Sequence, residues 1–448
     1  MTKTNNPRQL AVETLTKIEQ GAYSSLQLNQ VIQNSQIDER DVNLLTNIVY
    51  GVLQHKLTLT AQIKPFIKNP KKVQPWVIEL LKTAVYQLEY LNRIPKRAVF
   101  NETINIAKHL GHDGIRKMVT GILHQMDRSG LMNPAHIKDP LERLVMEYSV
   151  PKWIIEQLIE QVGIDKTTTI LASLNQPAKQ SVRINTALID RDTLIDQLTA
   201  EGYQVEPSPL AADGLILTGR SANAAKEFKT GELTIQDESA MLPVETMPIK
   251  PDQLILDACS APGGKTTQIA EQLSLQHSGQ VVALDLHESR LKQVVKNAKR
   301  MHLNDYITTK ALDARKLDQV YADETFNQIL VDAPCSGLGL MRRKPEIRYE
   351  KTSQDIEQLA TIQLAILNAI APKLKVGGQL TYSTCTIIDQ ENHDVLVAFL
   401  AQHPEFKLVP IKLAHVSSAS GELRIYPDDF DSDGFFVANL VKTEASAS

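Results

Sequence analysis

Residues 254–266 read Leu-Ile-Leu-Asp-Ala-Cys-Ser-Ala-Pro-Gly-Gly-Lys-Thr, and this stretch indicates the architecture of the second half of the chain. It opens on a short apolar run, and beyond it Ile269, Ala270 and Leu273 have the spacing of one helical face. Between the two, Gly263 and Gly264 permit close approach of the backbone to a ligand, and a new helix presents unpaired N–H groups to it. The stretch therefore predicts a strand, a ligand-binding turn and a helix.

The same order of strand, turn and helix recurs through the C-terminal part of the chain. Helical stretches cover residues 288–301 and 355–374. Buried strands that alternate with helices are typical of a parallel sheet with helices on both faces, and such sheets bind ligands at the carboxyl ends of their strands. We therefore expect an α/β, Rossmann-like domain over residues 241–443. Four of its strands are predicted from the β-prone runs at 254–256, 281–284, 329–331 and 379–382.

Two nucleotide-binding motifs and a metal site are disfavoured by the sequence. The Gly-Lys-Thr ending of the quoted stretch resembles a P-loop, but the Walker A pattern requires a glycine where Cys259 stands. The dinucleotide pattern G-x-G-x-x-G is absent as well. His109 and His112 have no companions at ligand spacing, and the chain contains no Cys-x-x-Cys pair, so we expect no metal.

The first 240 residues have a different character. Between Val77 and Leu91 the apolar residues fall on one helical face, other segments repeat the pattern, and prolines separate them, so residues 1–145 predict an all-α bundle. Residues 146–240 predict a small α+β domain. A short helix opens at Pro151 with Gly163 as its C-cap, and strand candidates at 181–185 and 214–218 lie around a helix near 192–198. Residues 444–448 form a polar tail. The chain is thus expected to be a multidomain protein.

Composition and charge favour a soluble protein that meets nucleic acid through its N-terminal part. Hydrophobic residues make up 42% and charged residues 22%, and neither a membrane-length apolar run nor a secretory signal is present, so we expect a cytoplasmic protein. Residues 1–145 hold 19 Lys and Arg against 12 Asp and Glu, whereas the remainder holds 29 against 40. The excess of positive charge suggests contact with phosphates, although an ordinary solvated surface is the alternative.

Acidic residues follow two of the predicted strands. Asp285 ends the strand at 281–284, where an acid in a doubly wound fold accepts hydrogen bonds from ribose hydroxyls. Its alternative role is the N-cap of the following helix. Asp313 follows a further strand, expected between the runs at 281–284 and 329–331, and could pair with an adenine amino group, or it is an ordinary loop aspartate.

The three cysteines all lie in the last 190 residues, each in a turn-like stretch after an apolar run. Cys335 belongs to Asp-Ala-Pro-Cys-Ser-Gly-Leu-Gly (332–339), and Cys385 to Tyr-Ser-Thr-Cys-Thr (382–386). Both stretches follow predicted strands of one sheet, so both thiols are expected at its carboxyl edge, beside the turn that contains Cys259. The alternative is that they are buried, inert thiols.

This arrangement resembles the RNA cytosine-5 methyltransferase family, which carries one cysteine in each of the two loops. The resemblance covers roughly residues 150–443. It implies S-adenosyl-L-methionine as the cofactor and attack by Cys385 on carbon 6 of a cytosine. It assigns Cys335 to the release step, in which this residue helps proton loss from carbon 5 and elimination of the enzyme. It further implies that Asp332 contacts the cytosine near N3. The implied cofactor contacts are Cys259, Ser260, Ala261, Pro262, Gly263, Gly264, Lys265, Asp285, Asp313 and Asp332; Ser260 and Thr386 depart from the family's frequent alanine and serine.

The chemistry that the resemblance implies requires a thiol. Carbon 5 of cytosine is a poor nucleophile, and addition of a soft nucleophile to carbon 6 makes it enamine-like. Only the thiolate attacks effectively, and a cysteine with a pKa of about 8.5 is a few per cent ionised at pH 7. The target base must also leave its stack to enter such a site.

Basic residues follow the first cysteine loop, in the segment Arg-Arg-Lys-Pro-Glu-Ile-Arg (342–348). We expect them to grip phosphates that flank the target base, and a solvated basic loop is the alternative. The residues concerned are Arg342, Arg343, Lys344 and Arg348.

The N-terminal part narrows the substrate class. Residues 8–15, 41–51 and 98–104 resemble the NusB-type helical RNA-binding domain. A NusB-like domain joined to this methyltransferase is the arrangement of bacterial small-subunit rRNA methyltransferases, which implies 16S ribosomal RNA, naked or in an early assembly particle, as the partner of a monomeric enzyme. Two alternatives stay open: a transfer RNA methyltransferase with the same chemistry, and a non-catalytic RNA-binding assembly factor.

Overall fold

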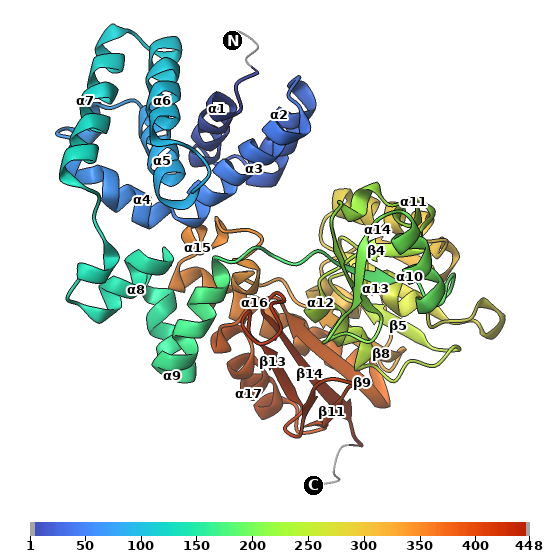
Figure 1. Cartoon of the computed structure of the whole chain (residues 1–448). Helices are drawn as coiled ribbons and strands as arrows, with labels where there is room; N and C mark the ends of the chain where they lie inside the picture. The colour runs from blue at the N-terminus through green and yellow to red at the C-terminus, as the bar shows by residue number, and fades with distance from the viewer. Residues whose placement is uncertain (1–4, 445–448) are drawn as a thin grey trace. The chain divides into compact units, whose positions relative to one another are not determined.

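The computed structural model describes residues 5–444 of the chain and divides it into two compact units, Met1–Asn175 and Gln176–Ser448. Figure 1 shows helices alone in the first unit and both helices and strands in the second. Within residues 5–444, no helix combines the length and apolarity that a membrane span requires.

The first unit is helical throughout its described residues, as the sequence predicts. Its core consists of apolar side chains such as Leu15, Leu45 and Leu80, which lie on the inward faces of the helices. The helices are α1 (Pro7–Glu19), α2 (Ser24–Asn34), α3 (Glu39–Gln54), α4 (Lys56–Ile63), α5 (Pro75–Tyr90), α6 (Lys96–Leu110), α7 (Asp113–Ser129), α8 (Pro140–Tyr148) and α9 (Lys152–Leu174).

The helical unit extends further along the chain than the boundary expected at residue 145. α9 packs on α8, and α8 packs on α4, so both helices belong to the first unit. Within α9 the backbone leaves the helical conformation at Gly163, which has φ 81°. That is the position at which the periodicity of the sequence predicts a helix end.

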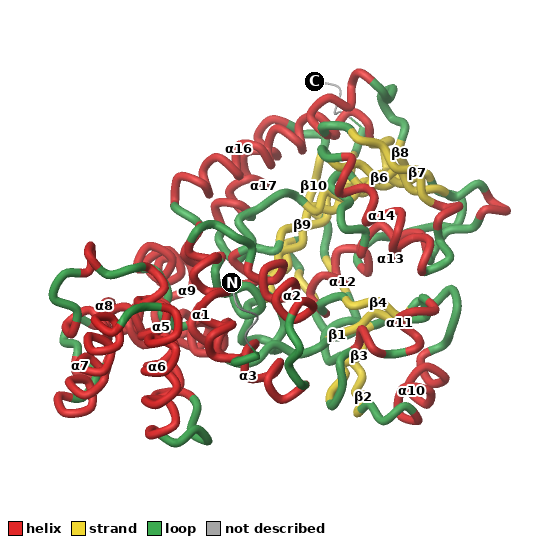
Figure 2. The backbone as a smooth tube through the Cα atoms, turned by 90° about the horizontal axis from the view of Figure 1, so that it is seen from above, coloured by secondary structure: helices red, strands yellow, loops and turns green. Residues whose placement is uncertain are grey.

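The second unit begins with a small antiparallel sheet in the order β2-β3-β1-β4. Figure 2 shows these strands apart from the strands of the larger sheet. The predicted α+β segment is therefore present, and its first strand begins at Ser181, as expected. The elements are β1 (Ser181–Ile184), α10 (Arg191–Ala200), β2 (Gln204–Pro207), β3 (Gly214–Thr218), α11 (Lys226–Thr230), β4 (Leu233–Ile235) and α12 (Glu238–Glu245).

The larger sheet has the strand order β10-β14-β9-β8-β5-β6-β7, and β13 pairs with β14. The five strands from β9 to β7 are parallel, as predicted, whereas β14 runs antiparallel to β9. Its strands are β5 (Leu254–Asp257), β6 (Gln280–Asp285), β7 (Ile307–Ala311), β8 (Phe326–Asp332), β9 (Leu374–Thr384), β10 (Phe406–Leu408), β13 (Glu422–Ile425) and β14 (Phe435–Lys442); β11 (Ile411–Lys412) and β12 (Ser417–Ser418) pair separately.

Helices cover both faces of the larger sheet, as the alternation of elements predicts. On one face, side chains of α16 and α17 pack against alternate strand residues such as Leu256 and Val331. On the other face, Ile255 and Leu330 pack with residues of α12 and α13. The helices are α13 (Gly264–Ala270), α14 (Glu288–Arg300), α15 (Ile347–Glu350), α16 (Ser353–Ile370) and α17 (His393–Gln402). Because β5 to β9 are parallel, the loops that follow them meet at one edge.

A buried arginine joins the small sheet to the turn after β5. Arg183 of β1 is fully buried and forms an ion pair with Glu271, which follows α13. Its guanidinium also donates to the Gln236 side chain, at 3.0 Å, and to the Thr267 hydroxyl, at 2.9 Å. Burial raises the pKa of Glu271 to about 7, although the positive charge of Arg183 opposes this effect. The small sheet therefore helps to fix the glycine-rich turn.

Candidate active site

Two thiols lie side by side at the carboxyl edge of the larger sheet. Cys335 follows β8 and Cys385 directly follows β9, and these strands are neighbours that pair Asp332 with Ser383. The two sulfur atoms are 3.3 Å apart, and both cysteines are free. The structure thus brings together the two cysteines that the sequence places at one sheet edge.

Backbone contacts hold the two cysteine loops together. The Ala333 N–H donates to the Ser383 carbonyl, and the Gly339 N–H donates to the Cys385 carbonyl, both at 2.9 Å. A Cβ at Gly339 would lie 1.9 Å from the carbonyl oxygen of Gly434 and 2.8 Å from that of Cys385. Only glycine therefore permits this approach.

The three thiols have different surroundings. The hydrogen bond with Cys385 and burial raise the pKa of the Cys335 thiol well above its usual range, and the charges of Glu391 and Asp332 act in the same direction. Cys335 therefore keeps its proton at neutral pH, and either sulfur atom can be the donor in the hydrogen bond between the two thiols. Burial also raises the pKa of the Cys259 thiol, whose side chain packs on the main core. Cys259 fits the expectation of an inert thiol.

Asp332 ends β8 and faces a cation. Its Oδ2 accepts from the Lys265 ammonium at 2.8 Å, and its Oδ1 accepts from the Ser383 hydroxyl at 2.9 Å. The Lys265 ammonium also lies 4.9 Å from the centre of the Phe435 ring. The sequence placed Lys265 only in the cofactor turn, because nothing in its spacing indicates that it would reach Asp332, 67 residues further along the chain.

The glycine-rich turn is held against β6 and α14. The N–H and hydroxyl of Ser260 both donate to the Leu284 carbonyl, at 2.7 and 2.8 Å. The Asn297 side chain donates to the Pro262 carbonyl at 3.0 Å. Gly263 has φ +103°, and a Cβ there would lie 3.0 Å from Cα of Val294. This position therefore requires glycine for both its conformation and its space.

Four carboxylates follow successive parallel strands beside this turn: Asp257, Asp285, Asp313 and Asp332. Asp285 accepts from the His287 N–H at 3.0 Å and pairs with Arg290 at 3.2 Å. α14 begins at Glu288, so Asp285 is not its N-cap. The Arg315 guanidinium donates to Asp313 and lowers the pKa of that carboxyl.

Asp257 is a site residue to which the sequence assigned no role. Burial raises its pKa to about 7, and the Thr266 hydroxyl donates to its Oδ2 at 2.6 Å. Its other oxygen is buried and has no hydrogen-bond partner in the part of the chain that the structure describes. An unsatisfied buried acceptor among several carboxylates fits a ligand that carries positive charge and N–H donors.

Three protein families match successive parts of the chain. Residues 244–441 match the family described as 16S rRNA methyltransferase RsmB/F, residues 5–128 match the NusB family, and residues 150–222 match the ferredoxin-like domain of RsmF/B-like methyltransferases. The chain is 42% identical over 448 aligned residues to the probable ribosomal RNA small subunit methyltransferase B of Bacillus subtilis (strain 168), covering 98% of this chain and 99% of that protein. The chain belongs to the RsmB/F family of 16S rRNA methyltransferases.

Two solved structures are similar in fold to this chain. The crystal structure of PH0851 has a TM-score of 0.84 and 26% identity, covering 99% of this chain and 100% of its own. A methyltransferase homolog protein from Pyrococcus horikoshii has a TM-score of 0.60 and 27% identity, covering 68% of this chain and 100% of its own. The predicted fold class, a NusB-like bundle, a small α+β domain and a Rossmann-like methyltransferase domain, is confirmed.

In this RsmB/F chain, the basic segment after Cys335 faces inward at three of its four basic positions. Arg342 is 5% exposed and donates to the carbonyls of Asp431 and Pro427, at 2.8 and 2.7 Å. Arg343 bridges two carboxylates, those of Asp237 and Asp433, at 2.6 and 2.9 Å.

Arg348 is fully buried, and of the four only Lys344 is exposed. The expectation that Arg342 and Arg348 bind phosphates is therefore wrong for this conformation, because both side chains are inaccessible to RNA. The segment folds back through short helical turns, so its guanidinium groups satisfy the protein's own acceptors.

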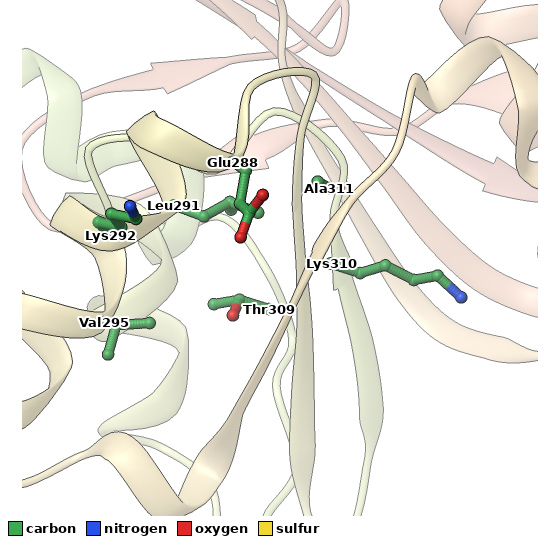
Figure 3. Close-up of a pocket in the computed structure, with 7 residues that line it drawn as sticks. All are labelled: Glu288, Leu291, Lys292, Val295, Thr309, Lys310 and Ala311. Carbon is green, nitrogen blue, oxygen red and sulfur yellow. The ribbon is translucent and has the colours of Figure 1, made fainter.

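A hollow of about 520 Å³ lies between α14 and the edge strand β7, away from the cysteines. Figure 3 shows the residues around it, with Leu291 and Val295 of α14 on one side and Thr309 of β7 on the other. It contains none of the predicted site residues of the RsmB/F chain, and we assign it no role.

Proposed function

We propose that this RsmB/F family member transfers a methyl group from S-adenosylmethionine to carbon 5 of a cytosine in 16S ribosomal RNA, through a covalent bond between Cys385 and carbon 6. The observation that carries the proposal is the pair of thiols 3.3 Å apart at the carboxyl edge of the sheet, beside the glycine-rich turn. Two cysteines in two strand-end loops are what the family resemblance implies for this chemistry.

The surroundings of the two thiols favour Cys385 as the nucleophile. Because the pKa of Cys335 is raised by its hydrogen bond with Cys385 and by burial, Cys335 remains a donor at neutral pH. A donor 3.3 Å from the Cys385 sulfur stabilises the thiolate that attacks carbon 6. In the release step, the same donor can hydrogen-bond to the departing Cys385 sulfur, which corresponds to the elimination part of the role that the resemblance implies for Cys335.

Asp332 is suited to hold the cytosine edge near N3. Its two oxygens are already oriented by Lys265 and Ser383, so the carboxylate is fixed before the base arrives. The ammonium of Lys265 offsets the negative charge of Asp332 and of the adduct as the sulfur adds to the ring.

The residues around the glycine-rich turn fit the proposed cofactor. When bound, S-adenosylmethionine supplies an electrophilic methyl group on a sulfonium. Residues 259–265 would hold it with their backbone, and Asp257, Asp285, Asp313 and Asp332 offer carboxylates to a ligand that carries two positive charges. The unsatisfied oxygen of Asp257 is an acceptor for one of its donors.

Small-subunit ribosomal RNA is the proposed substrate because the relative from Bacillus subtilis and the matched family carry that name, and the chain aligns with that relative over nearly its whole length. The match of residues 5–128 to the NusB family favours this substrate over transfer RNA. The paired thiols favour an enzyme over a non-catalytic assembly factor.

The test is to map 5-methylcytosine in the ribosomal RNA of a strain that lacks this protein, and to restore it with the purified chain, S-adenosylmethionine and the strain's small-subunit RNA. We expect one cytosine of 16S RNA to lose its methyl group and to regain it. A methyl group restored on another atom, or on transfer RNA alone, contradicts the proposal.

A further inference from the structure

A buried carboxylate lies behind the two cysteine loops. Glu391 ends the short 3-10 helix η10 (Asp389–Glu391), six residues after Cys385, and it is fully buried. It has no place in the chemistry described so far. A buried glutamate is costly unless its oxygens are hydrogen-bonded, so its partners indicate what it does.

One set of partners belongs to the loop of Cys335. The Ser336 N–H donates to Glu391 Oε1 at 2.7 Å, and the Ser336 hydroxyl donates to Oε2 at 2.5 Å. The Gln363 amide of α16 donates to Oε1 at 3.1 Å and to the Pro334 carbonyl at 3.0 Å. Both chain neighbours of Cys335 are therefore held by this group.

The other set belongs to the loop of Cys385. The hydroxyl of Thr386, the residue after Cys385, lies 3.0 Å from the Ser336 hydroxyl that donates to Glu391, and Thr386 lowers the pKa of the Glu391 carboxyl. The Tyr382 hydroxyl, near the end of β9, donates to the Glu391 carbonyl at 2.6 Å. One side chain thus connects the residue after the first cysteine to the residue after the second.

The partners also suit a negative charge. Among the described residues, Glu391 Oε1 accepts from two N–H donors, which cannot accept a proton from it, and Oε2 accepts from the Ser336 hydroxyl. Burial raises the pKa of Glu391, and its hydrogen bonds with Ser336, Thr386 and Gln363 oppose this effect. A carboxylate with this many donors can remain ionised inside the protein.

We propose that Glu391 is a positioning residue, which holds the two cysteine loops at their separation and places a negative charge behind Cys335. The inference rests on the proposed function for its catalytic meaning. The charge disfavours ionisation of Cys335, so the pair contains one donor and one nucleophile rather than two competing thiolates. Glu391 touches neither cysteine sulfur in the hydrogen-bond network and acts through Ser336 and Thr386.

Two substitutions separate the charge from the reach of the side chain. Glu391→Gln keeps the length, can still accept from the Ser336 N–H and can donate to the Ser336 hydroxyl, but it lacks the charge. Glu391→Asp keeps the charge and shortens the bridge. Glu245→Gln is the matched control: burial raises the pKa of Glu245 to about 7, and the backbone of Ala212 and Asp213, outside the cysteine loops, opposes this effect.

The first measurement needs no RNA. The full-length protein is alkylated with iodoacetamide over a range of pH, and the labelling of Cys335 and Cys385 is read from separate peptides by mass spectrometry. We expect Glu391→Gln to move the midpoint for Cys335 to lower pH, whereas Glu391→Asp and Glu245→Gln leave it near that of the unmodified protein. An unmoved midpoint in folded Glu391→Gln protein overturns the inference.

The second measurement follows methyl transfer to RNA. We expect Glu391→Asp to lower kcat by about tenfold without changing KM for RNA, because the thiols are displaced while the RNA surface is intact. An unchanged kcat argues against the positioning role. If Glu391→Gln does not fold, Ser336→Ala replaces it, since it removes the shared hydroxyl; unchanged kcat there also overturns the inference.

Failure of the proposed function gives a different result. In that case the unmodified protein transfers no methyl group to carbon 5 of cytosine, whereas the alkylation profile of Cys335 still responds to Glu391→Gln.

Discussion

The three cysteines of this chain show how surroundings assign different roles to one side chain. Cys259 packs on the core beside the glycine-rich turn, where burial raises the pKa of its thiol. Cys335 and Cys385 share a hydrogen bond at the sheet edge, where that bond and burial raise the pKa of the Cys335 thiol. A cysteine in the sequence indicates only that a reactive thiol could be present. The groups around each sulfur atom determine whether that thiol takes part in the reaction and in which role.

Cys385→Ala is predicted to abolish methyl transfer and to leave the affinity for S-adenosylmethionine unchanged. The substitution removes the proposed nucleophile but none of the carboxylates around the turn. Methyl transfer to RNA and equilibrium binding of the cofactor are the measurements. Activity retained with cofactor affinity lost would reverse the assignment of roles.

Cys335→Ala is predicted to accumulate a covalent complex between protein and RNA, because attack by Cys385 remains while the donor for the departing sulfur is lost. A slowly migrating band on a denaturing gel, with RNA and S-adenosylmethionine present, is the expected result. The doubly substituted protein that also lacks Cys385 is the control and should show no such band. Absence of the band in the single variant contradicts the division of labour.

At the scale of single elements, local sequence predicted much of the second unit. The run at 214–218 became β3 with those bounds, and the stretch 288–301 became α14 to within one residue. β14 was missed because all but its last two residues are buried, which removes the alternation that would mark an antiparallel strand. The inward direction of Arg342 could not be predicted, since its acceptors come from residues 427–431, far along the chain.

Some residues of the candidate site could be predicted from the sequence and others could not. Loops after parallel strands share an edge, so the meeting of Cys335 and Cys385 follows from the strand pattern. Glu391 and Asp257 were missed because a single acidic residue near a strand end reads as an ordinary loop or cap residue. Their significance is apparent only from burial and hydrogen bonding, which depend on the packed structure.

Gly339→Ala is predicted to destabilise the protein and to lower methyl transfer. The added carbon would meet the backbone oxygens of Gly434 and Cys385, so the cysteine loops must separate. We expect a loss of about 2 kcal/mol in unfolding free energy, typical of overpacking against rigid groups. Thermal melting and methylation rates measure the two effects. Gly121→Ala, in α7, is the control, because its added carbon meets nothing within 4 Å; a similar loss there would exclude the steric explanation.

At the scale of the whole molecule, the N-terminal and C-terminal parts of the chain carry net charges of opposite sign. The N-terminal unit carries the excess of Lys and Arg, and the methyltransferase part carries the excess of Asp and Glu, several of them at the proposed cofactor site. Overall net charge, which is −4, conceals this division. The family matches follow the same succession, from NusB through the ferredoxin-like domain to the methyltransferase.

Arg183→Met is predicted to loosen the small sheet from the glycine-rich turn, with a cost that grows as the pH rises. The folded-state pKa of Glu271, about 7, exceeds its unfolded value, so ionisation of Glu271 between those values reduces stability, and loss of Arg183 raises that pKa further.

We expect a loss of about 3 kcal/mol at pH 8 and a smaller loss at pH 5. Melting curves at the two pH values provide the measurement, and addition of Glu271→Gln to the variant should recover part of the loss at pH 8. A loss independent of pH would show that the unpaired charge is not its cause.

The sulfur atoms of Cys335 and Cys385 are close enough to form a disulfide bond with little movement. They lie 3.3 Å apart, and the S–S bond of a disulfide is roughly 2.05 Å long. A peroxide would supply the oxidising equivalents, taking two electrons from the pair, and the two thiol hydrogens would leave in the reduced products, water among them. The cross-linked protein would lack its nucleophile until a dithiol reductant restored it. We therefore expect methylation by a peroxide-treated sample to be lost and to return with dithiothreitol, and a thiol count that peroxide leaves unchanged would contradict this consequence.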